Sequence, residues 1–437
     1  MANRFSSRGD GAGIGWSAAC AGLLVALAAD GAFGQWPQWG GRQQDFIVKT
    51  SGLADTWPDT GPKQLWSRDL GDGFSGIIAD RGKLFTMYRS EGKEVVVALD
   101  QKSGETIWEH AYDAPVGENH VRQFGEGPRS TPLVFGKGLY TIGIAGIMHC
   151  LNKKNGEIIW STDLWKDHEG TWQNHGYSCG AFPYKDTVIV MVGGKGHSIV
   201  ALDKKTGKVN WKKLSFENSY STPKLIQVDG EDMLLCFMAQ ELAGIDPANG
   251  KLKWKFEHGN RWNQNITLPL YGDDGHIFFS SIEAGARVIK LSKKGRRYKV
   301  NEVWSDPKVQ IYHSQAFRFG DHVYGCSGAR GPGIFTCIDV KTGEVAWRER
   351  GFSKATCIYA DDKFIILDED GKLGLARATP EEFKILTQAQ VLDRVAWTVP
   401  TLVDTTLYIR DKKRIIAFDL ARDSYAAAEK PGEGPAS

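Results

Sequence analysis

The chain has 437 residues, a formal net charge of +2 at pH 7, and a composition that is 41% hydrophobic and 11% aromatic. This is enough apolar material for a large core. The nearly balanced charge excludes the strongly basic surface that nucleic acids or anionic membranes attract, so we expect no nucleic-acid partner.

The first 34 residues have the pattern of a secretory signal peptide. Arg4 and Arg8 provide a basic start, residues 16–29 form a short apolar run, and residues 32–34 include small residues suited to cleavage. The run is too short for a comfortable membrane span, and no later stretch is long enough. The sequence therefore predicts export to the periplasm or cell envelope, with no transmembrane span in the mature chain.

A strand–turn–strand unit recurs along the rest of the chain. In its clearest copy, residues 96–108, Asp100 can hydrogen-bond its own turn and Gly104 supplies the positive φ of a bulged hairpin. The tryptophans that end successive copies lie 42 to 52 residues apart, a period typical of propeller blades. The glycines and tryptophans of this repeat are Gly104, Gly156, Gly207, Gly250 and Gly343, with Trp66, Trp108, Trp160, Trp211, Trp254, Trp304 and Trp347.

A shorter hairpin with a polar or glycine-rich turn precedes each copy and occurs eight times. Two hairpins make a four-stranded blade, so we predict an all-β, eight-bladed β-propeller of antiparallel blades over residues 62–421. An N-terminal strand near 64–70 is expected to complete the last blade with strands near 395–420 and close the ring. Residues 35–61 form a lead-in segment, and residues 422–437 are expected to be a disordered tail.

The repeat supports a family resemblance. The pattern of residues 201–211, Ala-Leu-Asp-Lys-Lys-Thr-Gly followed by Trp211, resembles the quinoprotein-type (PQQ-like) repeat. Exported propellers with this repeat are similar to BamB, the propeller component of the outer-membrane barrel assembly machinery. Residues 36–41 and 127–132 resemble exported quinoprotein-like propellers of planctomycetes. The resemblance covers roughly residues 36–421 and implies the fold, whereas function has to be argued from the site.

Six cysteines follow the signal segment, without a CxxC motif or an adjacent pair. We expect buried free thiols, and Cys326 with Cys337 is the first disulfide to check because the two lie on neighbouring predicted strands. No metal-ligand motif is present.

The loops that lead into the innermost strands surround one mouth of the channel, and their polar and aromatic residues should converge there. Such residues also fill propeller channels for purely structural reasons. The candidate binding residues are His120, Arg122, Arg129, Trp172, His175, Tyr177, Tyr220, Arg261, Trp262, Asn263, Asn265, Tyr312, His313 and Trp397.

Three functions remain open. The first is a non-enzymatic binding or scaffold protein, expected to be a monomer, that holds a protein, peptide or small molecule at the channel mouth. The second, implied by the resemblance, is an oxidoreductase that uses pyrroloquinoline quinone (PQQ) with calcium, held by Arg129, His175, Asn265, His313 and Trp397. The chain lacks the adjacent cysteine pair and haem motif of many such enzymes. The third is a BamB-like assembly factor. The repeat tryptophans are expected to pack between blades rather than stack on a cofactor.

Overall fold

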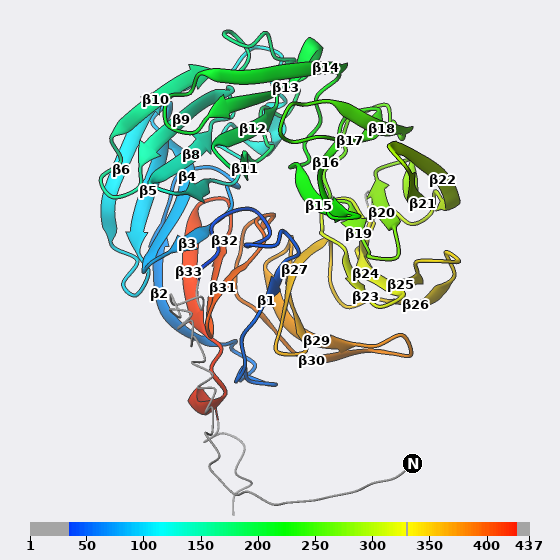
Figure 1. The fold of residues 1–437 in the computed structure, drawn as a ribbon. Helices are drawn as coiled ribbons and strands as arrows, with labels where there is room; N and C mark the ends of the chain where they lie inside the picture. The colour runs from blue at the N-terminus through cyan, green and yellow to red at the C-terminus, as the bar shows by residue number, and fades with distance from the viewer. Residues whose placement is uncertain (1–34, 329–330, 426–437) are drawn as a thin grey trace, which may run out of the picture. The chain divides into compact units, whose positions relative to one another are not determined.

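Eight β-sheets are arranged as blades around a ring in the computed structural model, which describes residues 35–328 and 331–425 (Figure 1). In these ranges the helical elements are two single turns, η1 (Arg122–Phe124) and η2 (Arg422–Ser424). The predicted all-β, eight-bladed propeller is therefore confirmed. The predicted signal peptide lies outside the described residues.

The first four blades each contain four antiparallel strands in sequence order. Blade one consists of β3 (Ile78–Asp80), β4 (Lys83–Ser90), β5 (Lys93–Asp100) and β6 (Thr106–Asp113). Blade two consists of β7 (Leu133–Phe135), β8 (Gly138–Ile142), β9 (Ile147–Asn152) and β10 (Ile158–Asp163). Blade three consists of β11 (Phe182–Tyr184), β12 (Thr187–Met191), β13 (Gly194–Asp203) and β14 (Val209–Phe216). Blade four consists of β15 (Lys224–Val228), β16 (Glu231–Phe237), β17 (Glu241–Ile245) and β18 (Leu252–Glu257).

The remaining blades include the two that receive N-terminal strands. Blade five consists of β19 (Leu270–Tyr271), β20 (His276–Ser281), β21 (Gly285–Lys294) and β22 (Arg297–Asp306). Blade six consists of β23 (Phe317–Phe319), β24 (His322–Ser327), β25 (Ile334–Asp339) and β26 (Val345–Glu349). Blade seven consists of β27 (Ala355–Ala360), β28 (Lys363–Asp368), β29 (Lys372–Ala378) and β30 (Phe383–Gln390), joined by β1 (Ile47–Val48). Blade eight consists of β31 (Thr401–Val403), β32 (Thr406–Arg410) and β33 (Arg414–Asp419), with β2 (Lys63–Asp69) paired antiparallel to β33.

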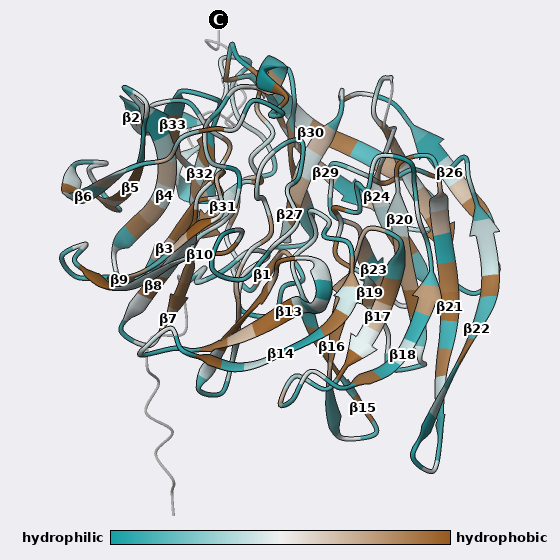
Figure 2. Cartoon of the chain, turned by 90° about the horizontal axis from the view of Figure 1, so that it is seen from above, coloured by the Kyte–Doolittle hydropathy of each residue, from teal (hydrophilic) through white to brown (hydrophobic). Residues whose placement is uncertain are grey.

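Burial within a blade depends on strand position. The second and third strands of blade one, β4 and β5, are mostly buried in their central residues because neighbouring blades cover both faces, whereas the outermost strand β6 has Trp108 buried and its other residues exposed or half-buried. Figure 2 shows hydrophilic and hydrophobic residues in turn along β21 and β22, the third and fourth strands of blade five. The hydrophobic core therefore lies between the blades.

The tryptophans of the repeat pack between neighbouring blades, as predicted. An ideal Cβ placed on any of the five repeat glycines would lie 2.5 to 2.8 Å from the indole ring of the preceding blade's tryptophan. Most of these indoles also donate a hydrogen bond to a backbone carbonyl of the next blade: Trp66 to Gln101, Trp108 to Lys153, Trp160 to Lys204, Trp304 to Val340 and Trp347 to Thr379. The repeat glycines are needed because no side chain fits beneath these rings.

Trp254 departs from this pattern. Its Nε1 donates to the sulfur of Met233 in its own blade at 3.0 Å. Blade five has no Asp-to-Gly turn to receive the indole, because β21 continues to Lys294 before the chain reverses.

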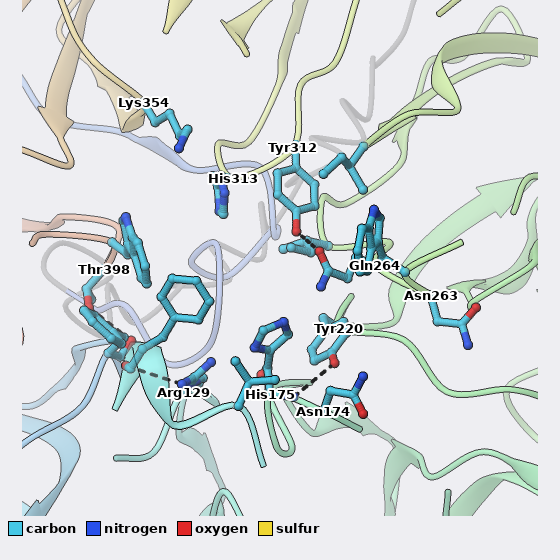
Figure 3. A pocket seen from close by; sticks show the side chains of 18 of the residues that line it. Arg129, Asn174, His175, Tyr220, Asn263, Gln264, Tyr312, His313, Lys354 and Thr398 are labelled. Atoms are coloured by element: carbon cyan, nitrogen blue, oxygen red, sulfur yellow. Dashed lines mark hydrogen bonds between the residues drawn. The ribbon is translucent and has the colours of Figure 1, made fainter. Parts of the chain in front are cut away.

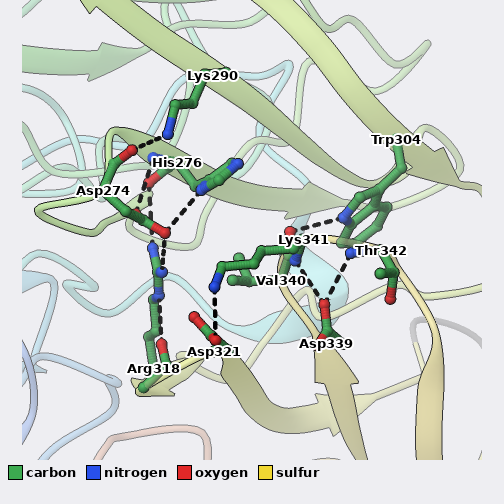
Figure 4. Close-up of polar contacts among 11 residues, drawn as sticks. Asp274, His276, Lys290, Trp304, Arg318, Asp321, Asp339, Val340, Lys341 and Thr342 are labelled. Atoms are coloured by element: carbon green, nitrogen blue, oxygen red, sulfur yellow. Dashed lines mark hydrogen bonds and ion pairs between the residues drawn. The ribbon is translucent and has the colours of Figure 1, made fainter.

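Polar contacts also join neighbouring blades, as Figure 4 shows for blades five and six. Arg318 of β23 pairs with the Asp274 carboxylate at 2.8 Å, and His276 contacts the same oxygen at 2.8 Å. Partial burial raises the pKa of Asp274, but the hydrogen bonds from Arg318 and His276 outweigh it and hold that pKa below its ordinary value. These surface contacts join blades five and six in addition to the packing of Trp304 against Gly343.

Residues 36–48, which we call the channel segment, cross the centre of the ring. Trp36 forms an antiparallel bridge with Ala79 on β3, and the carbonyl of Pro37 accepts a hydrogen bond from Val134 on β7. The Gln44 amide donates to the carbonyl of Pro223, just before β15, and β1 pairs with β27. The segment therefore contacts the inner strands or their leading loops in blades one, two, four and seven.

Two expectations need correction. Blade seven has five strands rather than four, and β1 is parallel to β27, because the inner edge of that blade remains open to the channel segment. Residues 422–425 of the expected disordered tail are ordered: the Tyr425 hydroxyl accepts a hydrogen bond from Lys63 N and donates one to the carbonyl of Asp419. The rest of that tail lies outside the described residues.

All six cysteines in the described part of the chain are buried free thiols. Cys326 faces Phe335 and Cys337 faces Tyr324 across the β24–β25 pair, so neither lies opposite the other. Buried free thiols were the expected state.

Candidate functional site

A cavity of about 730 Å³ lies at the mouth where the loops lead into the innermost strands, and all eight blades contribute to its wall (Figure 3). Blade one supplies Phe74, blade seven Lys354, and blade eight Trp397 and Thr398. Short hydroxyl hydrogen bonds tie these loops together: Ser75 donates to the carbonyl of Ser130 at 2.7 Å, and Thr401 to that of Ile77 at 2.6 Å. The cavity wall is thus built from the same contacts that join the blades.

The structure brings together most, but not all, of the candidate residues predicted from the loops. The candidates that line the cavity are Arg129, His175, Tyr220, Arg261, Trp262, Asn263, Tyr312, His313 and Trp397. The candidates outside its lining are His120, Arg122, Trp172, Tyr177 and Asn265.

Two of the residues outside the lining, His120 and Trp172, support the loops of blades two and three. His120 is buried and its Nε2 lies 3.1 Å from the carbonyl of Gly125, while its ring meets Trp172 edge-on. Trp172 in turn packs on Trp165 with a ring-centroid distance of 4.4 Å. These contacts fix the loop that carries Arg129.

The other three have partners elsewhere in the protein. Tyr177 is fully buried and its hydroxyl donates to the carbonyl of Met191. The Asn265 amide is also fully buried and donates to the carbonyls of Met238, Ala239 and His258. Arg122 forms an ion pair with Glu126.

Several lining residues carried no signal in the sequence. Trp39 belongs to the channel segment, which has no repeat, and the others are scattered polar or apolar loop residues. They are Trp39, Phe74, Val121, Gln123, Phe124, Thr131, Asn174, Ser178, Thr222, Gln264, Ile266, Ile282, Lys354 and Thr398. The tryptophans of the Trp36 to Gly41 motif were the one feature of the sequence that could have indicated that the lead-in segment contributes to the cavity.

One side of the cavity is an aromatic surface centred on Trp397. Its ring lies 5.0 Å from that of Phe74 and 5.4 Å from that of Phe124, measured between centroids. The ring of His313 is nearly parallel to Trp397, with an interplanar angle of 13° and a centroid distance of 6.1 Å. Flat or apolar groups would be stabilised against these faces.

Arg129 is the cation whose charge is not paired within the described residues. Its Nη2 donates to the carbonyls of Phe124 and Gly125, while the buried Nε has no hydrogen-bond partner there. By contrast, Lys354 lies 3.6 Å from Glu369, and Arg261 lies 2.8 Å from Glu283. Burial lowers the pKa of Arg129, but arginine remains charged at pH 7.

The histidines and tyrosines on the wall are neutral at pH 7. Burial and the nearby Arg129 charge lower the pKa of His175 to about 4, and burial with Lys354 does the same for His313. Burial raises the pKa of Tyr220 to about 12. No Asp or Glu is among the lining residues, so the charged side chains of the lining are all cationic.

The PQQ and calcium implied by the resemblance can be tested against these residues. Arg129 and the Trp397 face suit a flat, negatively charged ring system. Calcium sites in proteins usually include carboxylates, yet none lines the cavity, and the described residues hold no group of three or more His, Cys, Asp or Glu able to bind a metal. Because Asn265 already donates to three carbonyls, it does not face a cofactor. The residues that line the cavity therefore do not fit a calcium-bound quinone.

Fold and cavity together define a propeller with a partly aromatic cavity at one mouth of its channel, whose charged lining residues are cationic. The family model described as outer membrane protein assembly factor BamB matches residues 92–349, and the chain belongs to this family. The part of the chain that the structure describes contains no helix long and apolar enough to span a membrane.

Individual relatives are more distant. The chain is 27% identical over 203 residues to the outer membrane protein assembly factor BamB of Kangiella koreensis, a match that spans 46% of this chain and 45% of that protein. It thus covers about half the length of this relative. BamB from Moraxella catarrhalis superposes with a TM-score of 0.54 at 16% identity, covering 82% of this chain and 98% of that one. The quinohemoprotein alcohol dehydrogenase ADHIIG from Pseudomonas putida HK5 gives 0.61 at 14% identity, covering 92% and 82%. At these identities the structural likeness concerns the fold alone.

Proposed function

We propose that this chain is a non-enzymatic binding protein whose ligand carries a negative charge and occupies the cavity at the channel mouth. The observation that carries the proposal is the partly buried guanidinium of Arg129, which forms no ion pair with a carboxylate of the described residues and donates only to backbone carbonyls. A buried, unpaired charge is costly, and an anionic group on a ligand would offset that cost. The aromatic surface around Trp397 would bind the ligand's apolar part.

Two dyes with the same rings test this proposal. Anilinonaphthalenesulfonate is an anion, and phenylnaphthylamine is its neutral counterpart; both become fluorescent in apolar sites. We expect the anion to bind wild type, and Arg129→Gln to weaken it about 10-fold or more without affecting the neutral dye, because a hydrogen bond to a charged group contributes about 1.5–3 kcal/mol. Lys154→Gln, at an exposed turn of blade two, is the control. Equal losses for both dyes, or none, would contradict the proposal.

Family membership favours a second candidate, participation in outer-membrane protein assembly. This candidate and the binding function both include export to the periplasm or cell envelope. Fractionation of the native host with determination of the mature N-terminus would test export. Co-purification of an outer-membrane barrel protein with the wild-type chain would favour assembly, and its absence after mild cross-linking would count against it.

A further inference from the structure

The channel segment closes the cavity on its inner side. Trp39 of this segment is part of the cavity wall, and it packs edge-on against Phe46 at a centroid distance of 5.2 Å. Phe46 is 2% exposed, and the backbone of the segment is bonded to inner strands of blades one, two and seven. The segment therefore obstructs the channel at this point, so a ligand reaches the cavity from the side of the loops.

Burial of the lining residues changes from the interior of the cavity to its rim. Arg129 is partly buried and its Nε is enclosed, whereas the side chain of Arg261 is 63% exposed and Trp262 is 46% exposed. The Arg261 guanidinium lies over the Trp262 ring at 4.7 Å, and its Nη2 contacts Glu283. An exposed indole held in this way offers a flat surface at the rim of the cavity.

Amide and hydroxyl groups also line the cavity. Asn174, Gln264 and Tyr312 line the cavity, with the Tyr312 hydroxyl bonded to the Gln264 side-chain carbonyl. Figure 3 shows Arg129, His175 and Asn174 along one wall and Tyr312 and His313 on the other. Side chains of this kind suit the alternating donors and acceptors of a peptide backbone.

We infer that the cavity binds the C-terminal end of a peptide or protein. The terminal carboxylate would pair with Arg129, the last side chain would lie on Phe124 and Trp397, and the preceding residues would leave the cavity across Trp262. A terminal carboxylate is the charge that would offset the unpaired Arg129 guanidinium, and a cavity that has this charge in its interior favours a chain end over a chain interior. This inference rests on the proposed function and specifies its ligand.

Matched peptides test the inference by fluorescence anisotropy. The first is the hexapeptide Gly-Ser-Gly-Ser-Gly-Phe with an N-terminal fluorophore and a free C-terminus, and the second is its C-terminal amide. We expect the free acid to bind about 10-fold or more tightly than the amide, since the amide removes one charged partner. Arg129→Gln should abolish this difference. Arg129→Lys keeps the charge and serves as a second variant if the glutamine protein does not fold.

A third peptide tests whether the carboxylate has to be at the chain end or can belong to a side chain. It has the amidated C-terminus and an aspartate at its centre. If it binds as tightly as the free acid, or if acid and amide bind equally, the inference is overturned. If the anionic dye binds through Arg129 but no peptide binds or displaces it, the inference fails and the proposed function stands. If neither dye nor peptide depends on Arg129, both fail.

Discussion

Gly156 lies directly beneath the indole ring of Trp108, and an ideal Cβ at this glycine would stand 2.5 Å from Cε3 of that ring. Gly156 belongs to blade two and Trp108 to blade one, so the contact is one of the joints of the ring. Its φ of +77° also favours glycine over any other residue. The close contact with the Trp108 ring and the positive φ both arise because Gly156 lies in the turn between β9 and β10.

Gly156→Ala should therefore destabilise the protein more than its backbone conformation alone would. Gly136→Ala is the matched control, since Gly136 also has a positive φ, +64°, but nothing lies within 4 Å of its added Cβ. We expect the control to lose about 1 kcal/mol and Gly156→Ala a further ~1–3 kcal/mol from overpacking. Urea denaturation measures both. Equal losses would mean that the Trp108 ring moves aside freely.

Phe46→Ala tests whether the channel segment is part of the core and of the cavity. The Phe46 ring contacts Trp39 and Trp36 and is buried, so removing it should cost about 3–4 kcal/mol. Because Trp39 lines the cavity, the affinity for the anionic dye should fall as well. Ile159→Ala, at a side chain that is 48% exposed on β10, should change stability and dye binding little. A stable Phe46→Ala protein with unchanged dye binding would separate the segment from the site.

The blades could be predicted from the sequence because each repeat contains the residues that pack it against the neighbouring blade. The pair formed by Gly104 and Trp66 requires a neighbouring blade at fixed distance, and this requirement recurs at a regular period. In blade seven Ile385 takes the position of the tryptophan, opposite Ala376, as Trp347 lies opposite Cys337 in blade six. The channel segment was missed because residues 36–48 have no repeat and their partners lie far along the chain.

The candidate site was only partly predictable for a different reason. A loop's position in the repeat indicates which mouth it reaches, as it did for His175 and Trp397. It does not indicate which way each side chain points in irregular backbone. Tyr177 and Asn265 satisfy buried backbone carbonyls instead of facing the cavity, and such long-range hydrogen bonds leave no local pattern in the sequence.

His258 should make the free energy of unfolding depend on pH. It is 1% exposed, its Nε2 lies 2.8 Å from the Ser281 hydroxyl, and burial together with Arg287 lowers its pKa to about 3. The unfolded chain takes up this proton near pH 6.5, so stability is full above that pH and is lost as the pH falls toward 3. Other buried histidines, such as His149 with a pKa lowered to about 4, act in the same direction.

The variant His258→Gln isolates this contribution, because glutamine can still hydrogen-bond Ser281 but does not titrate. Between pH 7 and pH 5 the wild type should lose about 2 kcal/mol more stability than the variant, at about 1.4 kcal/mol per pKa unit. Urea denaturation at both pH values measures the difference. Parallel pH profiles for the two proteins would show that another group controls the acid response.

Arg410 should be the most sensitive residue at the joint between the last blade and the first. It is fully buried at the end of β32 and donates to the carbonyls of Gly73 and Met87 at 2.9 Å and to the Thr86 hydroxyl at 2.9 Å. Replacing it with methionine keeps much of the volume but leaves these buried acceptors of blade one unpaired, which should cost about 3–5 kcal/mol.

The control for this joint is Lys413→Met. Lys413 is an exposed residue in the turn between β32 and β33, so the loss should stay below about 0.5 kcal/mol. Native-state hydrogen exchange shows where the ring opens. In Arg410→Met the amides of β3 and β4 should lose protection before those of blades four and five, because the variant weakens the contact between the last blade and the first. Uniform loss of protection in all blades would instead indicate that the propeller unfolds as one cooperative unit.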